Sequence, residues 1–257
     1  MYDYTILVSE KVWQELLAIL PTPRQNRFGR KRCSKESLLN GILQVLVNGT
    51  AWSKIAFCGC SYVSCFRYFK ELQRRGKLKL IFKLVARERL DLTIGSIDTT
   101  TITSFEFSHM TGWDGFKKTV GTKVSLFVDK NGLPADVEFG KASYNDKVFL
   151  QSHIKNTVGM HKKVLNLDML YMNLNFRREM RKKGIRVNMK VRDQDFIRKR
   201  GPKFKFDAKI NQFRFMLERT NSWLKSFRHL RLRREYHPGI FKAFVYLALI
   251  IILVRYS

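Results

Sequence analysis

The hydrophobic pattern of this chain changes its period near residue 93, and that change limits which folds are possible. Before it, apolar residues recur at helical spacing in segments such as residues 10–20 and 34–49. After it, β-branched and mostly uncharged runs predict strands, beginning with residues 92–102. We therefore predict an all-helical part at residues 1–92 and an α/β part at residues 93–257.

The N-terminal part is predicted to contain three or four short helices with basic outer faces. The first stops at Pro21, and the second has Ser34 as a suitable N-cap and ends at Asn48-Gly49. A further amphipathic segment, SCFRYFKELQRR, closes at Gly76. Such helices are typical of a small helix-turn-helix-like DNA-binding module, although a basic face that is merely solvated is an equally good interpretation of this region alone.

The second part alternates strands and helices in an order that fits one mixed sheet. Asn131-Gly132 lies between the runs TKVSLFVD and ADVEFG and predicts a β-hairpin. A helix at residues 145–156, a buried strand KVLNLDMLY, a basic helix ending at Gly184 and a short strand RVNMKV are expected next. The remainder is helical by pattern, apart from a break at residues 237–239. This order predicts an α/β fold.

The charge balance points to a polyanionic partner. The chain has 49 Lys and Arg against 21 Asp and Glu, a formal net charge of +28. Such an excess disfavours the compact state unless an anion compensates it, and because the basic residues are spread along the chain, nucleic acid is the first candidate.

Neither end of the chain predicts a membrane or secreted protein. The apolar run from Ala243 to Val254 is shorter than the ~20 residues of a spanning helix, so we expect a buried terminal helix and no membrane partner. The N-terminal segment has no basic region ahead of an apolar one, so we expect a cytoplasmic, nucleoid-associated protein.

The four cysteines form a sequence cluster without a recognised metal-binding spacing. Cys58, Cys60 and Cys65 give C-x-C-x4-C, and Cys33 stands alone upstream. No Cys or His pair elsewhere completes a known zinc pattern, so the sequence favours reduced structural thiols over a metal site.

Three acidic residues occupy positions where a surface location does not readily explain their charge. Asp98 lies within a predicted core strand, Asp168 lies in the apolar run LNLDML, and Glu218 lies on a predicted helix one turn after Arg214. A carboxylate in a core strand is costly unless it is paired or binds a cation. Residues near strand ends of an α/β sheet meet in the crevice above it. The three carboxylates therefore predict an oxygen-only metal site that suits magnesium.

Such a site fits phosphodiester chemistry. Two divalent ions, Mg²⁺ or Mn²⁺, about 4 Å apart can activate an attacking oxygen and stabilise the leaving oxygen. For any one of these residues, an N-cap or a salt bridge to one of the many cations is the simpler interpretation. The three together, in this order and on a basic background, favour the metal site.

Several motifs resemble the insertion-sequence DDE transposases with a ribonuclease-H-like catalytic fold, over nearly the whole chain. Residues 96–100, SIDTT, are similar to the strand of the first aspartate, and residues 167–171, LDMLY, to the D-x-x-Y motif of the second. Arg214, Glu218 and Lys225 stand at the spacings of the Y-x2-R-x3-E-x6-K signature, followed by the family's Phe-Arg-x-Leu segment. In the N-terminal part, the spacing of Trp13, Pro21 and Trp52 looks like the family's leading helical domain.

The resemblance implies a fold, an activity and partners. It implies a ribonuclease-H-like mixed sheet after a small all-α domain, and hydrolysis at the ends of a mobile element followed by strand transfer to target DNA. Asp98 would bridge two metal ions, and Asp168 and Glu218 would each complete one coordination shell. The implied partners are double-stranded DNA, as terminal inverted repeats and target, and further copies of the chain in a homo-oligomer.

Basic residues of the third motif are the predicted DNA contacts: Arg214, Lys225, Arg219 and Arg228. For Arg214, a salt bridge to Glu218 on the same helix face is the alternative to phosphate binding.

The chain also departs from the family pattern. Asn211 stands at the signature tyrosine, and Met169, Leu170 and Met172 replace the residues usual around the second motif. These departures keep two alternatives open: a DNA-binding relative that has lost catalysis, and a ribonuclease-H-like nuclease without strand transfer.

Overall fold

The computed structural model describes residues 3, 7–25, 28–29, 31–105, 109–171, 173–190 and 206–257. The chain forms two compact units. The helical unit contains Met1–Val85, Ile102–Met110 and Trp223–Ser257, and the sheet unit contains Ala86–Thr101 and Thr111–Ser222. The predicted domain boundary after residue 92 stays a prediction, because the units divide the chain differently and group the C-terminal residues with the N-terminal helices.

The helical unit begins with the helices expected from the sequence. They are α1 (Glu10–Ile19), α2 (Lys35–Asn48), α3 (Tyr62–Arg74) and α4 (Lys77–Arg89), with a short 3-10 turn η2 (Trp52–Lys54) between α2 and α3. The side chain of Ser34 accepts the Ser37 N–H at the start of α2, and Gly49 ends this helix in the left-handed region at φ 70°. Both predicted caps of α2 are confirmed.

The last helix, α9 (Pro238–Tyr256), forms the core of the helical unit. Proline stands in its first turn, which explains the predicted break before it. The Phe244 ring of α9 lies 4.3 Å from the ring of Phe69 on α3. Among the described residues α9 is long and apolar enough to cross a membrane by length and composition, yet 72% of its apolar window is buried. A helix that is apolar on all sides is buried, and the predicted buried terminal helix is confirmed.

Residues 227–233 add short elements that the sequence pattern did not predict. After the 3-10 turn η7 (Arg228–Leu230), the two-residue strand β7 (Leu232–Arg233) pairs in parallel with Thr103 and Ser104. A strand this short has no periodicity to read, so only tertiary pairing reveals it.

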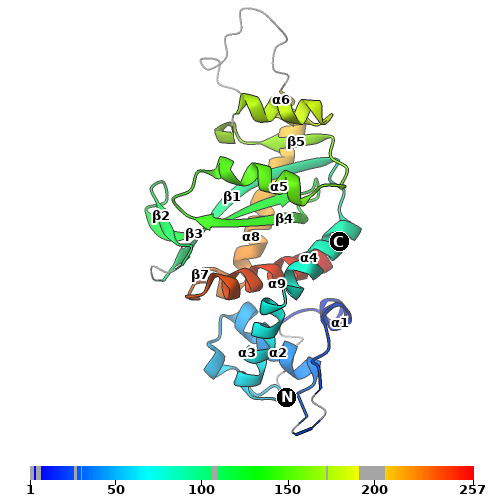
Figure 1. Cartoon of the computed structure of the whole chain (residues 1–257), viewed down its shortest axis with the longest axis vertical. Coiled ribbons are helices and arrows are strands. Elements are labelled where there is room, and N and C mark those ends of the chain that lie inside the picture. The colour runs from blue at the N-terminus through cyan, green and yellow to red at the C-terminus, as the bar shows by residue number, and fades with distance from the viewer. Residues whose placement is uncertain are drawn as a thin grey trace, which may run out of the picture. The chain divides into compact units, whose positions relative to one another are not determined.

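The sheet unit is built on a mixed sheet (Figure 1). Hydrogen-bonded neighbours follow the order β2-β3-β1-β5-β6, and β4 also pairs with β3. The strands are β1 (Ile94–Ser104), β2 (Gly112–Asp114), β3 (Thr119–Val128), β4 (Pro134–Lys141), β5 (Val164–Leu167) and β6 (Arg186–Asn188). β5 runs parallel to both β1 and β6, whereas β3 runs antiparallel to β2 and β4. The predicted mixed sheet is confirmed.

The predicted hairpin joins β3 to β4. The carboxylate of Asp129 accepts the N–H groups of Asn131 and Leu133, both at 2.8 Å, and Gly132 has φ 81°. Asp129 thus stabilises the turn that Asn131-Gly132 predicted.

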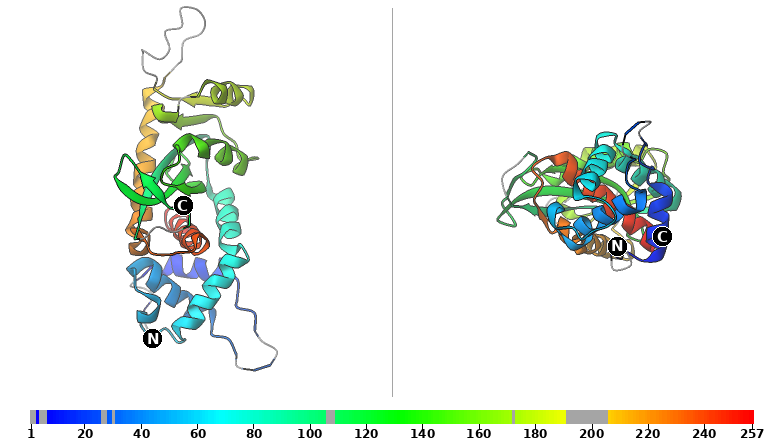
Figure 2. Two further views of the ribbon diagram at one scale, coloured as in Figure 1. Left: turned by 60° about the vertical axis from the view of Figure 1, so that its left-hand side comes forward. Right: turned by 90° about the horizontal axis from the view of Figure 1, so that it is seen from below.

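Helices cover both faces of the sheet (Figures 1 and 2). On one side lie η3 (Asp146–Phe149), α5 (Leu150–Asn156) and α6 (Leu174–Lys182). On the other side α7 (Ala208–Asn211), η6 (Gln212–Arg214) and α8 (Phe215–Ser226) run as one nearly continuous segment. Apolar residues of the strands pack with α5 and α6 in one core, which includes Ile97, Leu165, Leu167, Ile154, Phe176 and Met180. This core fixes β1 and β5, the two strands that lead to the predicted site.

We predict that Gly95→Ala destabilises the sheet unit. A Cβ at Gly95 would lie 2.3 Å from the Phe127 ring, so β1 or the ring must shift. Overpacking of this kind lowers the free energy of unfolding by about 1–3 kcal/mol. The measurement is urea-induced unfolding, and the matched control is Gly115→Ala, where a Cβ meets nothing within 4 Å. Equal stability of the two variants would contradict the prediction.

Candidate active site

Two of the predicted carboxylates are brought together by strand pairing. In the parallel register of β1 and β5, Ile97 lies opposite Leu167. Asp98 follows Ile97 within β1, and Asp168 follows Leu167 directly after β5 ends. The two aspartates therefore lie side by side at this end of β5. Ends of neighbouring parallel strands are where an α/β sheet places a site.

Asp168 lies just beyond its strand. The predicted strand KVLNLDMLY stops at Leu167, because the Asp168 carboxylate accepts the Leu170 N–H at 2.9 Å and turns the chain into η4 (Met169–Tyr171). Its other oxygen pairs with the guanidinium of Arg214 at 2.7 Å. Both side chains are about a third exposed, so this ion pair contributes little stability and leaves Asp168 accessible.

Asp98 carries the strongest electrostatic signal of the site. Burial raises the pKa of its carboxyl, and the nearby charges of Asp146 and Asp168 raise it further. The Thr99 N–H and the Arg214 guanidinium act in the opposite direction and lower that pKa. A half-buried carboxylate beside two others is stabilised by a cation, and perturbed acids of this kind cluster at functional sites.

Two residues near Asp98 were not among the predicted site residues. Asp146, at the start of η3, lies close enough for its charge to act on Asp98, and it forms an ion pair with Lys123 at 2.5 Å. Tyr171 is buried, and burial followed by the charge of Asp98 raises the pKa of its hydroxyl. In the sequence, Asp146 lies near the start of a predicted helix and Tyr171 within the D-x-x-Y motif. No local pattern shows that they meet Asp98.

The third predicted carboxylate, Glu218, is exposed on α8. Helix α8 is attached to the hairpin turn, because Arg219 donates to the Asn131 carbonyl and Thr220 to the Gly132 carbonyl. Glu218 follows Arg214 by one helical turn, about 6 Å along the helix axis. Within the part of the chain that the structure describes, Asp98, Asp168 and Glu218 do not form a group with all ligand atoms within 4.8 Å. Strand pairing thus places the two aspartates near each other, while the glutamate lies on α8.

The four predicted DNA-binding residues have different surroundings. Arg214 pairs with Asp168, a partner other than the Glu218 that the sequence suggested, and its Nε is buried without a hydrogen-bond partner among the described residues. Arg219 is half-buried against the hairpin turn. Lys225 near the end of α8 and Arg228 at the start of η7 are exposed and belong to the helical unit. Exposed cations of this kind are available to phosphate groups.

A buried Ser–His–Asp chain supports β1 and is structural. The Ser125 hydroxyl lies 2.9 Å from His153 Nε2, and His153 Nδ1 lies 2.8 Å from the carboxylate of Asp136. Ser125 also contacts the Asp98 carbonyl at 3.5 Å. The three side chains resemble a nucleophilic triad in residue type, but all are buried and none can reach a substrate.

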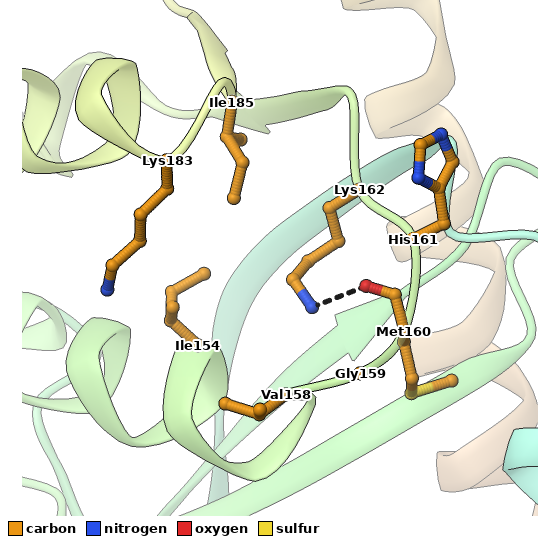
Figure 3. A pocket seen from close by; sticks show the side chains of 8 residues that line it. All are labelled: Ile154, Val158, Gly159, Met160, His161, Lys162, Lys183 and Ile185. Carbon is orange, nitrogen blue, oxygen red and sulfur yellow. Dashed lines mark hydrogen bonds between the residues drawn. The ribbon is translucent and has the colours of Figure 1, made fainter.

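A cavity of about 420 Å³ lies elsewhere in the sheet unit (Figure 3). Its lining includes Met160, His161 and Lys162, and none of the predicted site residues. The Lys162 ammonium donates to the Met160 carbonyl at 2.9 Å, and burial lowers its pKa. A cavity of this size takes a small molecule. The backbone of a DNA duplex needs an open surface, so we place the chemistry at the carboxylates.

The residues around Asp98 fit a hard divalent cation. Asp98, Asp168 and Asp146 offer only oxygen ligands, which magnesium and manganese prefer. Asp98 is half-buried, and Arg214 supplies the positive charge beside it. The donor set, and a half-buried carboxylate whose pKa is raised, agree with the predicted metal site.

Comparison with known proteins identifies the class to which this fold and site belong. The fold resembles a solved structure described as "Cryo-EM structure of piggyBac transposase synaptic complex with hairpin DNA (SNHP)", with a TM-score of 0.52, 9% identity, and 99% of this chain and 75% of that chain covered. At this identity the likeness shows the fold, which is that of a transposase with a ribonuclease-H-like sheet. No curated protein sequence matches the chain.

Comparison with known protein families then shows to which family the chain belongs. Residues 89–253 match the family described as "Transposase DDE domain", and residues 8–82 match "Putative transposase of IS4/5 family" (DUF4096). The chain belongs to the DDE transposases of insertion sequences. The predicted family, fold class and enzyme class are confirmed, and membership implies dependence on divalent metal ions.

We predict that Asp98→Asn stabilises the protein in the absence of divalent metal. The pKa of Asp98 is higher in the folded chain than in the unfolded chain, so the unfolded chain loses this proton at a lower pH. The free energy of unfolding therefore falls as the pH rises from the unfolded-state pKa to the folded-state pKa. Above the unfolded-state pKa the half-buried carboxyl therefore reduces stability, and asparagine removes this penalty while keeping an acceptor for the Thr99 N–H. Thermal unfolding at pH 7 in chelator measures the effect.

The control variant, Asp91→Asn, should change stability in the opposite direction. The Lys130 ammonium and then Thr93 lower the pKa of Asp91, so Asp91→Asn removes a favourable interaction and does not raise the melting temperature. If Asp98→Asn lowers the melting temperature like Asp91→Asn, Asp98 is a structural residue.

Proposed function

We propose that this transposase binds the ends of its mobile element, hydrolyses the phosphodiester there and transfers the freed 3′ end to target DNA. Asp98, Asp168 and Glu218 are the catalytic residues in this proposal. The observation that supports it best is the placement of Asp98 beside Asp168 by the parallel pairing of β1 with β5, with the Arg214 guanidinium paired to Asp168.

The proposed cofactor is a pair of Mg²⁺ or Mn²⁺ ions. When bound, such ions activate the attacking oxygen and stabilise the leaving oxygen of an in-line displacement. Asp98 would be the residue shared by both ions, because its pKa is raised and the charges of Asp146 and Asp168 act on it. Asp168 and Glu218 would each complete one coordination shell.

Arg214 has two roles in the proposal. Without metal it neutralises Asp168 and lowers the pKa of Asp98, which keeps the site charged and compact. With metal present the carboxylates no longer need it, and its guanidinium is released to a phosphate oxygen of the DNA. Glu218 follows Arg214 by one helical turn, and Arg214 pairs with Asp168, so Glu218 would have to turn toward the aspartates when metal binds.

The proposed partner is double-stranded DNA, as terminal inverted repeats and as target. The formal charge of +28 and the exposed Lys225 and Arg228 support this partner. The structure to which this fold is similar is described as a synaptic complex with DNA. Two element ends must be handled together, so we propose a homo-oligomer that assembles on DNA in the cytoplasm, associated with the nucleoid.

We predict that Asp98→Asn, Asp168→Asn and Glu218→Gln each abolish strand cleavage and joining. Loss of a metal ligand removes several kcal/mol of transition-state stabilisation, and each 1.36 kcal/mol is tenfold, so the rate falls by about 10³-fold or more. The assay uses purified protein, Mg²⁺ or Mn²⁺ and a duplex that carries the element end. Glu179→Gln is the control, because Glu179 is a surface acid that pairs with Lys183.

The outcome also separates the alternatives. Cleavage followed by joining supports the transposase proposal, and cleavage without joining identifies a nuclease. Binding without cleavage by the wild-type chain identifies a DNA-binding relative, which the changes at Asn211 and around Asp168 would then explain. Full activity of Glu218→Gln would remove Glu218 from the catalytic set.

We predict that Lys225→Ala and Arg228→Ala weaken binding to all DNA sequences alike. Each exposed cation that contacts a phosphate releases about one counterion, so each variant lowers the slope of log K against log salt by about 1. Fluorescence anisotropy over a salt series measures the slope. Lys79→Ala on α4 is the matched control, and an equal effect there would indicate a loss of net charge alone.

A further inference from the structure

Three cysteine thiols gather in the helical unit. The Sγ atoms of Cys58, Cys60 and Cys65 lie 3.8, 3.9 and 3.3 Å apart for the pairs 58–60, 58–65 and 60–65. All three side chains are buried. Among the residues that the structure describes, they are the one group of three metal-ligating side chains whose ligand atoms all lie within 4.8 Å of one another.

These separations are those of ligands around one tetrahedral metal ion. With zinc–sulfur bonds of about 2.3 Å, two thiolates at tetrahedral positions are roughly 3.8 Å apart. Two of the three observed separations, 3.8 and 3.9 Å, lie within about 0.1 Å of this value, and the third, 3.3 Å, is shorter by about half an ångström. We propose that Cys58, Cys60 and Cys65 bind one Zn²⁺ ion in the helical unit.

The loop that carries two of the ligands is shaped for this geometry. Gly59 between Cys58 and Cys60 has φ 92°, a conformation that side-chain-bearing residues rarely adopt, and it folds both thiols toward one point. The Gln44 side chain of α2 holds the loop from outside, because it accepts the Ala56 N–H at 2.7 Å and donates to the Ala56 carbonyl at 3.1 Å. The loop is therefore fixed to α2 independently of any metal.

The third ligand comes from the first turn of α3. Ser61 caps this helix by accepting the Ser64 N–H, which places Cys65 directly after the capped turn. The partial positive charge of a helix N-terminus favours a thiolate there. In the C-x-C-x4-C segment, the first two cysteines thus flank the Gly59 turn, and the third lies near the start of α3.

A glycine on the facing helix leaves room for the sulfur atoms. A Cβ at Gly41, in the middle of α2, would lie 2.5 Å from Cys65 Sγ and 3.2 Å from Cys58 Sγ. Glycine inside a helix costs about 1 kcal/mol relative to alanine, so a position that tolerates this cost has a packing reason. The reason here is the close approach of the thiol cluster.

The three thiols act on one another's ionisation, as expected of side chains close enough to share one bound cation. Contacts with Cys60 and Cys65 lower the pKa of Cys58, while the contact with Cys58 contributes most to raising the pKa values of the other two. Three negative sulfurs at this distance repel one another unless a divalent ion lies between them.

Cys33 is the candidate for the fourth ligand. It precedes the N-cap of α2, it is half-buried, and its charge acts on Cys65. Structural zinc sites are closed by four protein ligands. The sequence had pointed to reduced structural thiols, because Cys33 lies 25 residues before Cys58 and matches no familiar zinc spacing.

The experiment uses the full-length chain, purified with reductant and without chelator. Zinc is measured by mass spectrometry of the ashed protein, and the expected content is about one ion per chain. Cys58→Ser and Cys65→Ser should retain less than about a tenth of it, while the neighbouring variant Ser64→Ala retains it in full. Gly41→Ala should weaken zinc binding by about tenfold, because it displaces Cys65.

Cobalt substitution of the wild-type chain gives a second readout if the serine variants do not fold. Four-coordinate cobalt with thiolate ligands shows intense visible bands and a sulfur-to-cobalt charge-transfer band. If Cys33→Ser weakens the charge-transfer band, Cys33 is the fourth ligand; if the band is unchanged, water or another group completes the shell.

Two results would overturn the proposal. In one, the reduced wild-type chain, dialysed against zinc and then against buffer, holds no metal and shows no cobalt bands, which leaves packed thiols. In the other, a chain purified without reductant and then unfolded in chelator shows two of the four thiols missing on titration, and peptide mapping identifies a disulfide within the cluster.

Discussion

The parallel pairing of β1 with β5 is the interaction on which the catalytic half of this protein depends. It sets Asp98 beside Asp168 although the two residues are 70 positions apart in the chain. A core of strand residues, α5 and α6 holds this pairing in place. The Phe127 ring packs so closely on Gly95 that β1 cannot shift toward the ring. The site is therefore as rigid as the sheet, which is what a metal platform needs, because ligand positions must hold to within a fraction of an ångström.

This placement has an electrostatic cost that only a cation relieves. Asp98 is half-buried near two other acids, and Arg214 offsets part of the repulsion through its pair with Asp168. A carboxylate kept in such a position reduces stability and is explained by function. The continuous segment of η6 and α8 carries both Arg214 and Glu218, so in the proposed site the segment that pairs with Asp168 without metal would also complete the metal site.

Much of the fold was readable from local sequence, since caps and turns act over a few residues. Ser34, Asn48-Gly49 and Asn131-Gly132 each predicted the element boundary that the structure shows. The aspartates were predicted because a charge in an apolar strand is conspicuous. What the sequence did not reveal depends on contacts between distant segments: the approach of Asp146 to Asp98, the Arg214–Asp168 pair, the strand β7, and the gathering of three thiols against Gly41. None of these leaves a periodic or capping signal.

The central claim is that Asp98, Asp168 and Glu218 surround one metal site, and crystals grown with Mn²⁺ test it most directly. Anomalous scattering collected near the manganese absorption edge locates the ions independently of the protein coordinates. The account predicts peaks within about 2.0–2.3 Å of carboxylate oxygens of Asp98 and Asp168, with Glu218 turned toward them and Arg214 released from Asp168. A map with the Arg214–Asp168 pair intact and no peak beside Asp98 would contradict it.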